Sequence, residues 1–301
     1  MICVKTISTL LILLILNADA LIPIKELDTY YVAHTDGGAH PSWLKYVKED
    51  IKDTKISIHN IAKCMILFSF NANTEWLQHK LGLKNINIRI KSLGIKSHSE
   101  IHYLVSSLFV GKEAFTKFKG QGLQIALKGM TLKNYMANTE VIHNKLLSDS
   151  LYKKELGDLS MLIQKIWSDN LSPSITKDYS KLMQKFNSKT YFAPNVQALL
   201  DDVMEGLMQS PGNQANLKHA GTKGGSTSFV LTKAFYATDK KGYTTELALF
   251  FNDLTPTEAH QLTGSLNDFI VNLLFDYNFL NSITKTLKDK HTRQKITESG
   301  L

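Results

Sequence analysis

The sequence predicts an α+β fold, in which an antiparallel sheet is flanked by helices and joined to an all-helical subdomain. Three observations lead to this prediction. Helical apolar patterns fill much of the chain between residues 56 and 209, and short apolar runs follow at 217–222, 228–238 and 243–252. Pro256 then opens a long amphipathic helix. Helices followed by a compact meander of strands and a closing helix are typical of layered α+β domains.

Glycines mark the ends of the first predicted helices. The segment Ile56–Leu67 is largely apolar, which favours a buried helix. We expect Thr74–Leu83 to end at Gly82 and Ile86–Leu93 to end at Gly94, because glycine readily adopts the left-handed conformation that closes many helices. The sequence therefore predicts three consecutive helices in this part of the chain.

The second half of the chain supplies the predicted sheet and a helix to cover it. Residues 112–190 look helical, with weak boundaries, and we expect an insertion there; Asn195–Gln209 is an amphipathic helix. Strand alternation places every second residue of Ser228–Thr238 on a buried face. We expect that face to pack under the terminal helix Thr257–Phe275, on the side that carries Leu266.

Lysine dominates the charge of this chain. The 301 residues carry a formal net charge of +8, and Arg89 and Arg293 are the only arginines. Nucleic-acid surfaces more often show arginine clusters with interleaved aromatic residues, because guanidinium groups make bidentate and stacking contacts. The scattered lysines therefore indicate a solvated basic surface without a nucleic-acid partner. With 43% apolar residues, the chain is expected to be an ordinary globular protein and a monomer.

Cysteine and histidine give no sign of a metal centre. Cys3 lies in the apolar N-terminal segment and Cys64 in a predicted buried helix, so we expect no internal disulfide framework and an inert Cys64. His98, His102 and His143 lack the short spacings that bring metal ligands together. We therefore expect neither a metal nor a cofactor.

The first twenty residues have two interpretations. Lys5, the apolar run Ile7–Leu16 and Ala18-Asp19-Ala20 match the three parts of a secretory signal peptide, and the run is too short to span a bilayer. On this interpretation the protein is exported, to the periplasm or beyond the cell. Alternatively, the apolar run is the core helix of a chain that was once longer. In both cases we expect one domain over 21–283 and a polar tail over 284–301.

Two segments that lie far apart in the chain carry a family resemblance. In the first, an apolar helix ends at Ser69-Phe70-Asn71, and two stretches that end in Leu81-Gly82 and Leu93-Gly94 follow. In the second, His219-Ala220-Gly221-Thr222 opens a predicted hairpin. Together they resemble the Ser-Asp-Asn and Lys-Thr-Gly elements of class A β-lactamases and related D,D-peptidases, with phenylalanine replacing the aspartate and histidine replacing the lysine.

The resemblance implies a β-lactamase or transpeptidase-like fold with a site for a β-lactam or a peptidoglycan stem peptide. In such a site a serine nucleophile with an adjacent lysine attacks the carbonyl carbon. Ser69 then relays a proton to the leaving nitrogen, and Asn71 hydrogen-bonds the substrate side-chain amide. The alternative interpretation of Ser69 and Asn71 is structural, as the end of one helix and the cap of the next.

Strand residues complete the site that the resemblance implies. His219 supplies positive charge toward the substrate carboxylate, although imidazole is only partly charged near neutral pH. Gly221 leaves the strand backbone open to an extended substrate, and Thr222 offers a hydroxyl to the carboxylate. Backbone N–H groups near Lys223 form half of an oxyanion hole. We therefore expect Ser69 and Asn71 to face Thr222 across one cleft.

The Ser-x-x-Lys nucleophile motif of that family is missing from its expected place. Counting roughly fifty to sixty residues back from Ser69 reaches Ser8-Thr9, where apolar residues stand three positions on instead of lysine. Ser42, with Lys45 three positions on, is a candidate closer to Ser69. Two functions stay open: a serine hydrolase that uses Ser42 or an unrecognised serine, and a catalytically silent homologue that only binds ligands.

Overall fold

The computed structural model describes residues 17–33, 35–154 and 159–299. The chain divides into two compact units, Met1–Asp253 and Leu254–Leu301. The signal peptide or core helix expected over residues 1–20, and the Ser8-Thr9 region where a nucleophile was sought, lie outside the described residues except for positions 17–20. Both expectations stay predictions.

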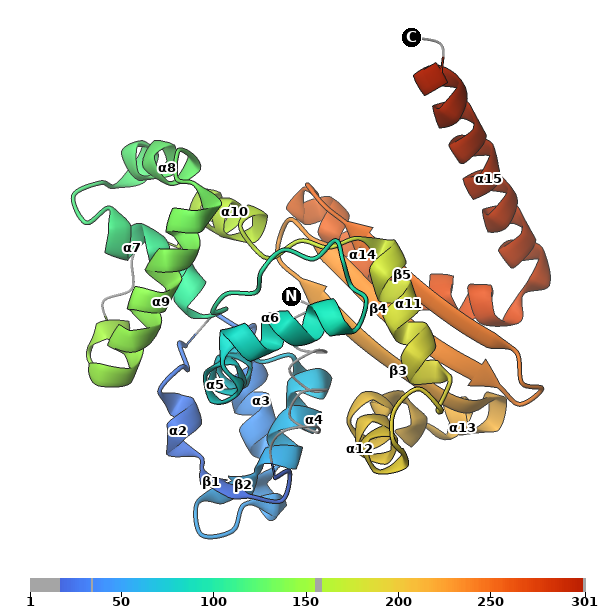
Figure 1. Ribbon diagram of the computed structural model, residues 1–301, viewed down its shortest axis with the longest axis horizontal. Coiled ribbons are helices and arrows are strands. Elements are labelled where there is room, and N and C mark those ends of the chain that lie inside the picture. The colour runs from blue at the N-terminus through green and yellow to red at the C-terminus, as the bar shows by residue number, and fades with distance from the viewer. Residues whose placement is uncertain (1–16, 34, 155–158, 300–301) are drawn as a thin grey trace. The chain divides into compact units, whose positions relative to one another are not determined.

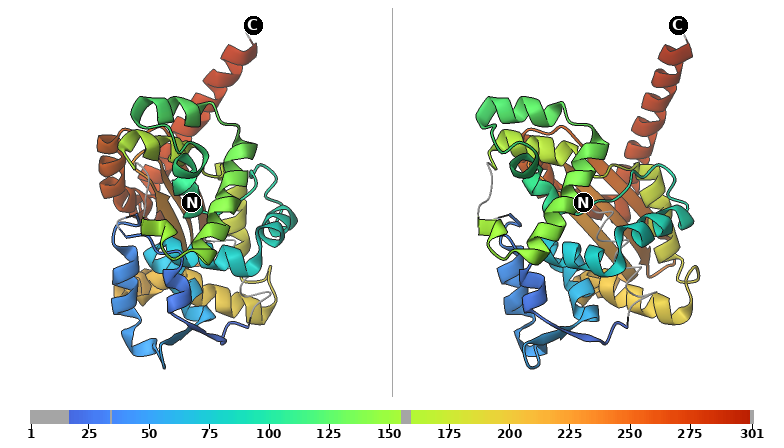
Figure 2. Two further views of the ribbon diagram at one scale, coloured as in Figure 1. Left: turned by 90° about the vertical axis from the view of Figure 1, so that its left-hand side faces the viewer. Right: turned by 60° about the vertical axis from the view of Figure 1, so that its left-hand side comes forward.

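Helices dominate the first unit before the sheet begins. They are α2 (Lys25–Asp28), α3 (Ala39–Tyr46), α4 (Ile58–Phe68), α5 (Asn71–Leu81), α6 (Leu83–Ser92), α7 (Val110–Ala114), α8 (Gly120–Lys128), α9 (Leu132–Ser148), α10 (Met161–Asp169), α11 (Thr176–Asn187), α12 (Pro194–Met204) and α13 (Pro211–Asn216). Short 3-10 helices lie at Lys48–Asp50, Ser106–Phe109, Tyr152–Lys154 and Gly206–Gln209. The helices of residues 110–169, green in Figures 1 and 2, gather on the side of this unit away from α12 and α13.

The glycine stops predicted for α5 and α6 are confirmed. Gly82 and Gly94 have φ angles of 75° and 77°, a region that glycine enters without steric cost. Helix α5 begins three residues before the predicted Thr74, because Phe70 takes an extended conformation and serves as its N-cap residue. Most of α5 is buried, including its polar residues, so its apolar periodicity is weak and its start was hard to predict.

A short two-stranded sheet anchors the start of α4. Strands β1 (Leu21–Pro23) and β2 (Lys55–Ser57) pair antiparallel, which the sequence patterns did not predict. The hydroxyl of Ser57 accepts a hydrogen bond from the N–H of Asn60 (3.2 Å) and so caps α4. This cap fixes where α4 begins, and the helix length then fixes where it ends.

The main sheet contains β3 (Leu217–Ser226), β4 (Leu231–Asp239) and β5 (Thr244–Phe251) in the order β3-β4-β5. All pairs are antiparallel, which confirms the predicted meander. The difference lies in β3, which continues to Ser226 instead of ending at Thr222. Gly224 and Gly225 extend it by pairing with Lys233 and Thr232 of β4.

Helix α11 covers one face of this sheet, as Figure 1 shows. The ring of Tyr179 lies 5.5 Å from that of Phe250, and the ring of Phe186 lies 6.3 Å from that of Tyr236, between centroids. Aromatic pairs at these separations stabilise a core beyond their buried area. The helix therefore holds β4 and β5 from the face that also carries Lys223.

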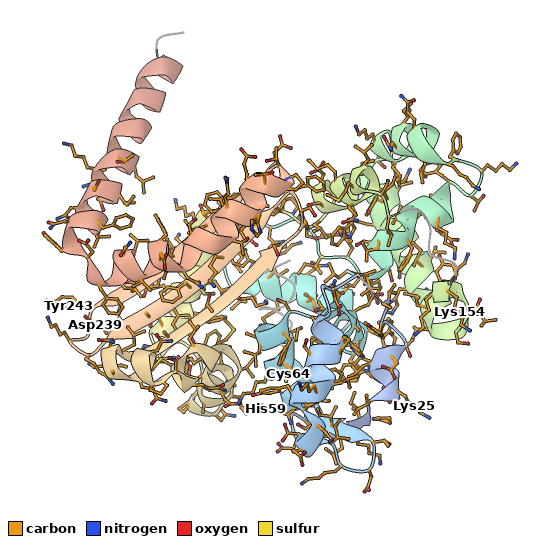
Figure 3. All side chains as sticks on the ribbon, turned by 180° about the vertical axis from the view of Figure 1, so that it is seen from behind. Lys25, His59, Cys64, Lys154, Asp239 and Tyr243 are labelled. Carbon is orange, nitrogen blue, oxygen red and sulfur yellow. The ribbon has the colours of Figure 1, made fainter. Side chains whose placement is uncertain are left out.

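The turn between β4 and β5 has the predicted position. Asp239 and Tyr243, labelled in Figure 3, exchange two hydrogen bonds: Asp239 N–H donates to the Tyr243 carbonyl (3.0 Å), and Tyr243 N–H donates to the Asp239 carboxylate (2.8 Å). Gly242 supplies the positive φ of 98° that the turn needs. The hairpin register is set by this turn.

Cys64 lies in α4 and is labelled in Figure 3. Its side chain is completely buried, and burial raises the pKa of the thiol to about 12. A thiol that stays protonated at neutral pH is a poor nucleophile and a poor metal ligand. The prediction of an inert core cysteine is consistent with this environment.

The second unit consists of helices α14 (Pro256–Phe275) and α15 (Tyr277–Ser299). Thr255 and Glu258 form a capping box at the start of α14, where Pro256 takes the first helical position. Part of the expected polar tail, residues 284–299, is helical within α15. Docking of the Leu266 face on the sheet stays a prediction. Within the three described stretches of the chain, no helix combines the length and apolar character that crossing a membrane requires.

Candidate active site

Ser69 lies at the junction of α4 and α5. It closes α4 in the left-handed conformation (φ 63°, ψ 21°), and its N–H donates to the carbonyl of Met65 (3.2 Å). A non-glycine residue rarely adopts this conformation, which costs about 1–2 kcal/mol. The ring of Phe70 is completely buried and stacks on Trp43 at 4.7 Å between centroids. This packing fixes the junction and with it the half-buried side chain of Ser69.

Lys223 of β3 reaches Ser69 across 154 positions of the sequence. Its Nζ lies within hydrogen-bond distance of Ser69 Oγ, and the lysine is only 4% exposed. Burial, and secondarily the positive charge of Lys233, lower the pKa of Lys223 to about 7. An amine with this pKa can both accept and donate a proton near neutral pH. Ser69 thus contacts this strand at Lys223, whereas the sequence analysis expected the approach at Thr222.

Gly221 lies two residues before Lys223 on the same strand face. Its partner on β4 is Tyr236, whose ring lies so close that a Cβ on Gly221 would be 2.4–2.5 Å from ring atoms. No larger residue fits there without displacement of the ring. The Tyr236 hydroxyl donates to the Glu205 carboxylate (3.1 Å), which fixes the ring in place. On this face Gly221 packs against Tyr236 instead of presenting open backbone to a ligand.

His219 takes no part in the Ser69–Lys223 contact. Lys223 lies four positions further along the extended strand, a distance of about 13 Å. Its Nε2 donates to the side-chain oxygen of Asn187 at the end of α11 (2.9 Å). Burial, followed by the charge of Lys189, lowers the pKa of His219, so the imidazole is neutral at pH 7. On this strand it is therefore Lys223 that reaches Ser69, while His219 contacts Asn187.

Asn71 and Thr222 flank the contact between Ser69 and Lys223. Asn71 opens α5, is buried, and its Nδ2 donates to the carbonyl of Thr35 (3.5 Å). Thr222 donates its hydroxyl to the carbonyl of Ala234 on β4 (3.0 Å). Because successive strand residues point to opposite faces, Thr222 and Lys223 project from different faces of β3. Asn71 thus follows Ser69 by two residues with its amide bonded to Thr35, and the Thr222 hydroxyl is engaged in the sheet.

Ser42, the candidate nucleophile upstream, lies on α3. Its side chain is exposed, and its hydroxyl donates to the carbonyl of Gly38 four residues earlier (2.9 Å). Lys45 is also exposed on this helix. The structure therefore does not bring Ser42 to Lys223, and it places the Ser42–Lys45 pair on solvated helix surface.

A cavity of about 240 Å³ opens at the end of β3, beyond Lys223 along the strand. Its walls come from Ser168–Ser174 after α10 and from hairpin residues that include Gly225 and Thr227. Ser168 Oγ and Thr227 Oγ1 are 2.7 Å apart and join these walls. Gly225 follows Lys223 by two residues on the same strand face. The sequence analysis missed this cavity because its walls are far apart in the chain.

A second buried polar cluster is centred on Glu75 of α5, which is completely buried. Its carboxylate accepts hydrogen bonds from the N–H groups of Val105 (2.5 Å) and Ser106 (2.9 Å), from the Ser106 hydroxyl and from Nδ1 of His143 (2.9 Å). His143 Nε2 lies 3.0 Å from Nδ1 of His79. Within residues 17–33, 35–154 and 159–299, no set of three potential metal-binding side chains is arranged around a common point.

Comparisons with known proteins bear on the fold. No protein-family model and no curated protein matches this sequence. Among solved structures, a class A β-lactamase representative from Bacteroides cellulosilyticus DSM 14838 has a TM-score of 0.52 and 15% identity, covering 93% of this chain and 82% of that one. The chromosome-encoded β-lactamase of Vibrio parahaemolyticus has a TM-score of 0.51 and 10% sequence identity, and the match covers 91% of this chain and 83% of that one. TLA-3 extended-spectrum β-lactamase has a TM-score of 0.50 and 13% sequence identity, and the match covers 89% of this chain and 82% of that one. The chain therefore has the β-lactamase-like α+β fold that its sequence predicted.

The side-chain position of Lys223 is the main feature that sequence reasoning missed. A signal was present, because Lys223-Gly224-Gly225-Ser226 also places a cation before glycine and a hydroxyl residue. It lies four residues beyond the His219 motif that was chosen. The two alternatives put their cations on the same strand face, so alternation alone does not separate them. The contact between Lys223 and Ser69 distinguishes the two alternatives.

Proposed function

We propose that this chain is a penicillin-recognising serine hydrolase that acts on β-lactams or on D-Ala-D-Ala-type cell-wall peptides. The contact between Ser69 and the buried Lys223, inside a β-lactamase-like fold, carries the proposal. Both ligand classes contain an amide whose nitrogen must gain a proton as it leaves. A serine–lysine pair whose amine has a pKa of about 7 can move that proton near neutral pH.

Charge and space near the pair support ligand binding. Both ligand classes carry a carboxylate, and the net charge of +8 attracts anions to the protein. Asn71 beside Ser69, and the β3 backbone beside Lys223, are the proposed hydrogen-bonding groups for an extended ligand. The cavity that begins at Gly225 offers about 240 Å³ for the group next to the reacting amide. No cofactor enters this proposal.

A catalytically silent homologue that binds the same ligands is the second candidate. Two observations favour it: the sequence around Ser8-Thr9 lacks the lysine of the expected nucleophile motif, and the Ser42 hydroxyl is engaged by the backbone of its own helix. On this candidate the protein retains a ligand through Asn71, Lys223 and the β3 backbone without forming a covalent bond. Hydrolysis of a chromogenic cephalosporin is then slow or absent.

Export and a monomeric state complete the proposal. The run Ile7–Leu16 followed by Ala18-Asp19-Ala20 supports a secretory signal peptide, and both ligand classes occur outside the cytoplasmic membrane. Fractionation of cells and sequencing of the N-terminus of the isolated protein test export. A mature chain that still begins at Met1, found in the cytoplasmic fraction, would contradict it.

Intact-mass analysis after incubation with benzylpenicillin tests the proposed function. We expect either a stoichiometric acyl adduct or, for the silent homologue, saturable binding of benzylpenicillin by titration calorimetry. Ser42→Ala should behave as the wild type does, because Ser42 lies away from Lys223. Absence of both an adduct and saturable binding, for benzylpenicillin and for a D-Ala-D-Ala peptide, would reject the ligand class altogether.

A further inference from the structure

We infer that Ser69 is itself the residue that becomes acylated, with the Lys223 amine as its base. The inference rests on the proposed function and assigns the nucleophile that the sequence motif failed to identify. A serine hydroxyl is a weak nucleophile unless a base lies within hydrogen-bond reach of its oxygen. Lys223 Nζ has this position at Ser69 Oγ.

The surroundings of Lys223 differ from those of two other partly buried lysines, Lys189 and Lys165. Lys189 lies against the carboxylates of Asp201 and Glu205, and Lys165 lies against Asp169 and Asp253. A carboxylate partner keeps an amine protonated and unable to accept a proton. Lys223 meets a hydroxyl instead, and the charged group that acts on it is the like charge of Lys233. Its environment therefore favours the neutral amine that a base requires.

Both partners are held by rigid structure. Ser69 is fixed by the end of α4 and by the buried ring of Phe70, and Lys223 lies inside a strand whose neighbours pair with β4 on both sides. A hydroxyl and an amine held in this way lose little conformational entropy when a ligand arrives. Ser69 is the half-buried member and Lys223 the buried one, so a ligand can approach the oxygen while the amine stays shielded from water.

The start of α5 provides favourable electrostatics for a negative charge at Ser69. The helix has 11 residues and begins two positions after Ser69. Its N-cap, Phe70, makes no side-chain cap hydrogen bond, and no acidic residue lies in the first turn. The positive end of the helix dipole is therefore not neutralised by its own residues. Charge that develops on a carbonyl oxygen bound to Ser69 lies close to this helix end.

The chemical step balances with groups on the protein and the ligand alone. As Ser69 Oγ forms a bond to the carbonyl carbon, its proton passes to Lys223 Nζ. The carbon–nitrogen bond of the amide then breaks, and the leaving nitrogen takes the proton back from Nζ. The product is an ester on Ser69 with the β-lactam ring opened, and water is the co-reactant that later hydrolyses the ester.

The inference is tested with benzylpenicillin and a fluorophosphonate probe on wild type, Ser69→Ala and Lys223→Met. Peptide mapping of the wild-type adduct should place the added mass on Ser69. Ser69→Ala should lose the adduct, and Lys223→Met should slow labelling by about 100-fold or more. Wild-type labelling should accelerate as pH rises through about 7. Ser148→Ala and Lys145→Met, both on the exposed surface of α9, serve as matched controls that label normally.

Thermal unfolding of each variant separates loss of reactivity from loss of fold. An adduct that maps to another residue, whether or not Ser69→Ala slows it, would overturn the inference and leave the proposed function intact. Saturable binding without an adduct, in a folded wild-type protein, would also overturn it and support the silent homologue. Failure of both labelling and binding would remove the proposed function together with the inference.

Discussion

Glu75 and Lys223 are both charged side chains buried in the first unit, but their surroundings differ. The Glu75 carboxylate accepts four hydrogen bonds, two of them from backbone N–H groups. Within the described part of the chain, the Lys223 amine meets one hydroxyl, that of Ser69. Burying a charge is costly unless hydrogen bonds replace the lost water. The comparison indicates that Glu75 stabilises the fold, whereas burial of Lys223 destabilises it and is explained by a chemical role for the amine.

His143, the histidine that bonds Glu75, is held between two tyrosine rings. The His143 ring is stacked on Tyr103 at 3.6 Å and on Tyr30 at 5.2 Å between centroids. His143 Nδ1 lies 2.9 Å from the Glu75 carboxylate, and its Nε2 lies 3.0 Å from His79 Nδ1. The carboxylate thereby ties α5 to α9 and to the turn at Val105.

Glu75→Leu should produce the largest loss of stability among the changes considered. It removes the acceptor for two backbone N–H groups, the Ser106 hydroxyl and His143, and buried donors left without partners typically cost about 3–5 kcal/mol together. Urea unfolding measures the change. Glu75→Gln keeps one acceptor oxygen and should lose markedly less. A loss below about 1 kcal/mol for Glu75→Leu would show that the cluster is not stabilising.

Lys223→Met should change stability in the opposite direction. Replacing a buried, poorly compensated charge by an apolar side chain of similar length should raise the free energy of unfolding at pH 7 by about 1–4 kcal/mol.

The pKa of Lys223 is lowered to about 7 in the folded protein, so the unfolded chain binds more protons between pH 7 and pH 10. Wild-type stability should therefore rise from pH 7 to pH 9, by about 2 kcal/mol from this group.

The same pH series on Lys223→Met is the control for that prediction. Its stability should rise less over the window than that of the wild type, because the Lys223 amine is absent, whereas shifts that both proteins share, such as the raised pKa of the Cys64 thiol, cancel in the comparison. A Lys223→Met protein that is less stable than the wild type at pH 7 would contradict the view that burial of this lysine is costly.

Gly221→Ala tests the packing beside Lys223. The added Cβ would lie 2.4–2.5 Å from the Tyr236 ring, and the resulting shift should cost about 1–3 kcal/mol. In a double-mutant cycle, Tyr236→Ala should remove most of the stability loss caused by Gly221→Ala, because the Tyr236 ring is what the added Cβ displaces. Additive losses in the double variant would show that the strain lies elsewhere.

The two regions also differ in how far sequence could predict them. The three strands, the glycine stops at Gly82 and Gly94 and the approach of Ser69 to β3 follow from local patterns and a motif. The extension of β3 through Gly224 and Gly225 does not, because glycine has low strand propensity and pairs here only through β4. That extension is what carries Lys223 into the sheet.

The surroundings of Glu75 were beyond sequence reasoning for a different reason. Its partners come from a loop 30 positions away and from α9, 68 positions away. A glutamate inside a mixed helix is ordinarily solvated, and nothing in the residues around it signals complete burial. Long-range hydrogen bonds of this kind are set by tertiary packing and carry no local periodicity.

A direct titration of Lys223 Nζ tests whether this amine, held at Ser69, loses its proton near neutral pH. Heteronuclear NMR of protein labelled with ¹⁵N at lysine side chains, with Lys223→Met to identify the signal, follows that nitrogen from pH 5 to pH 11. We expect a midpoint at about 7, far below the usual value of about 10.4 for lysine. A midpoint above 10 would contradict it, because the amine would then be protonated wherever the protein works and could not serve Ser69 as a base.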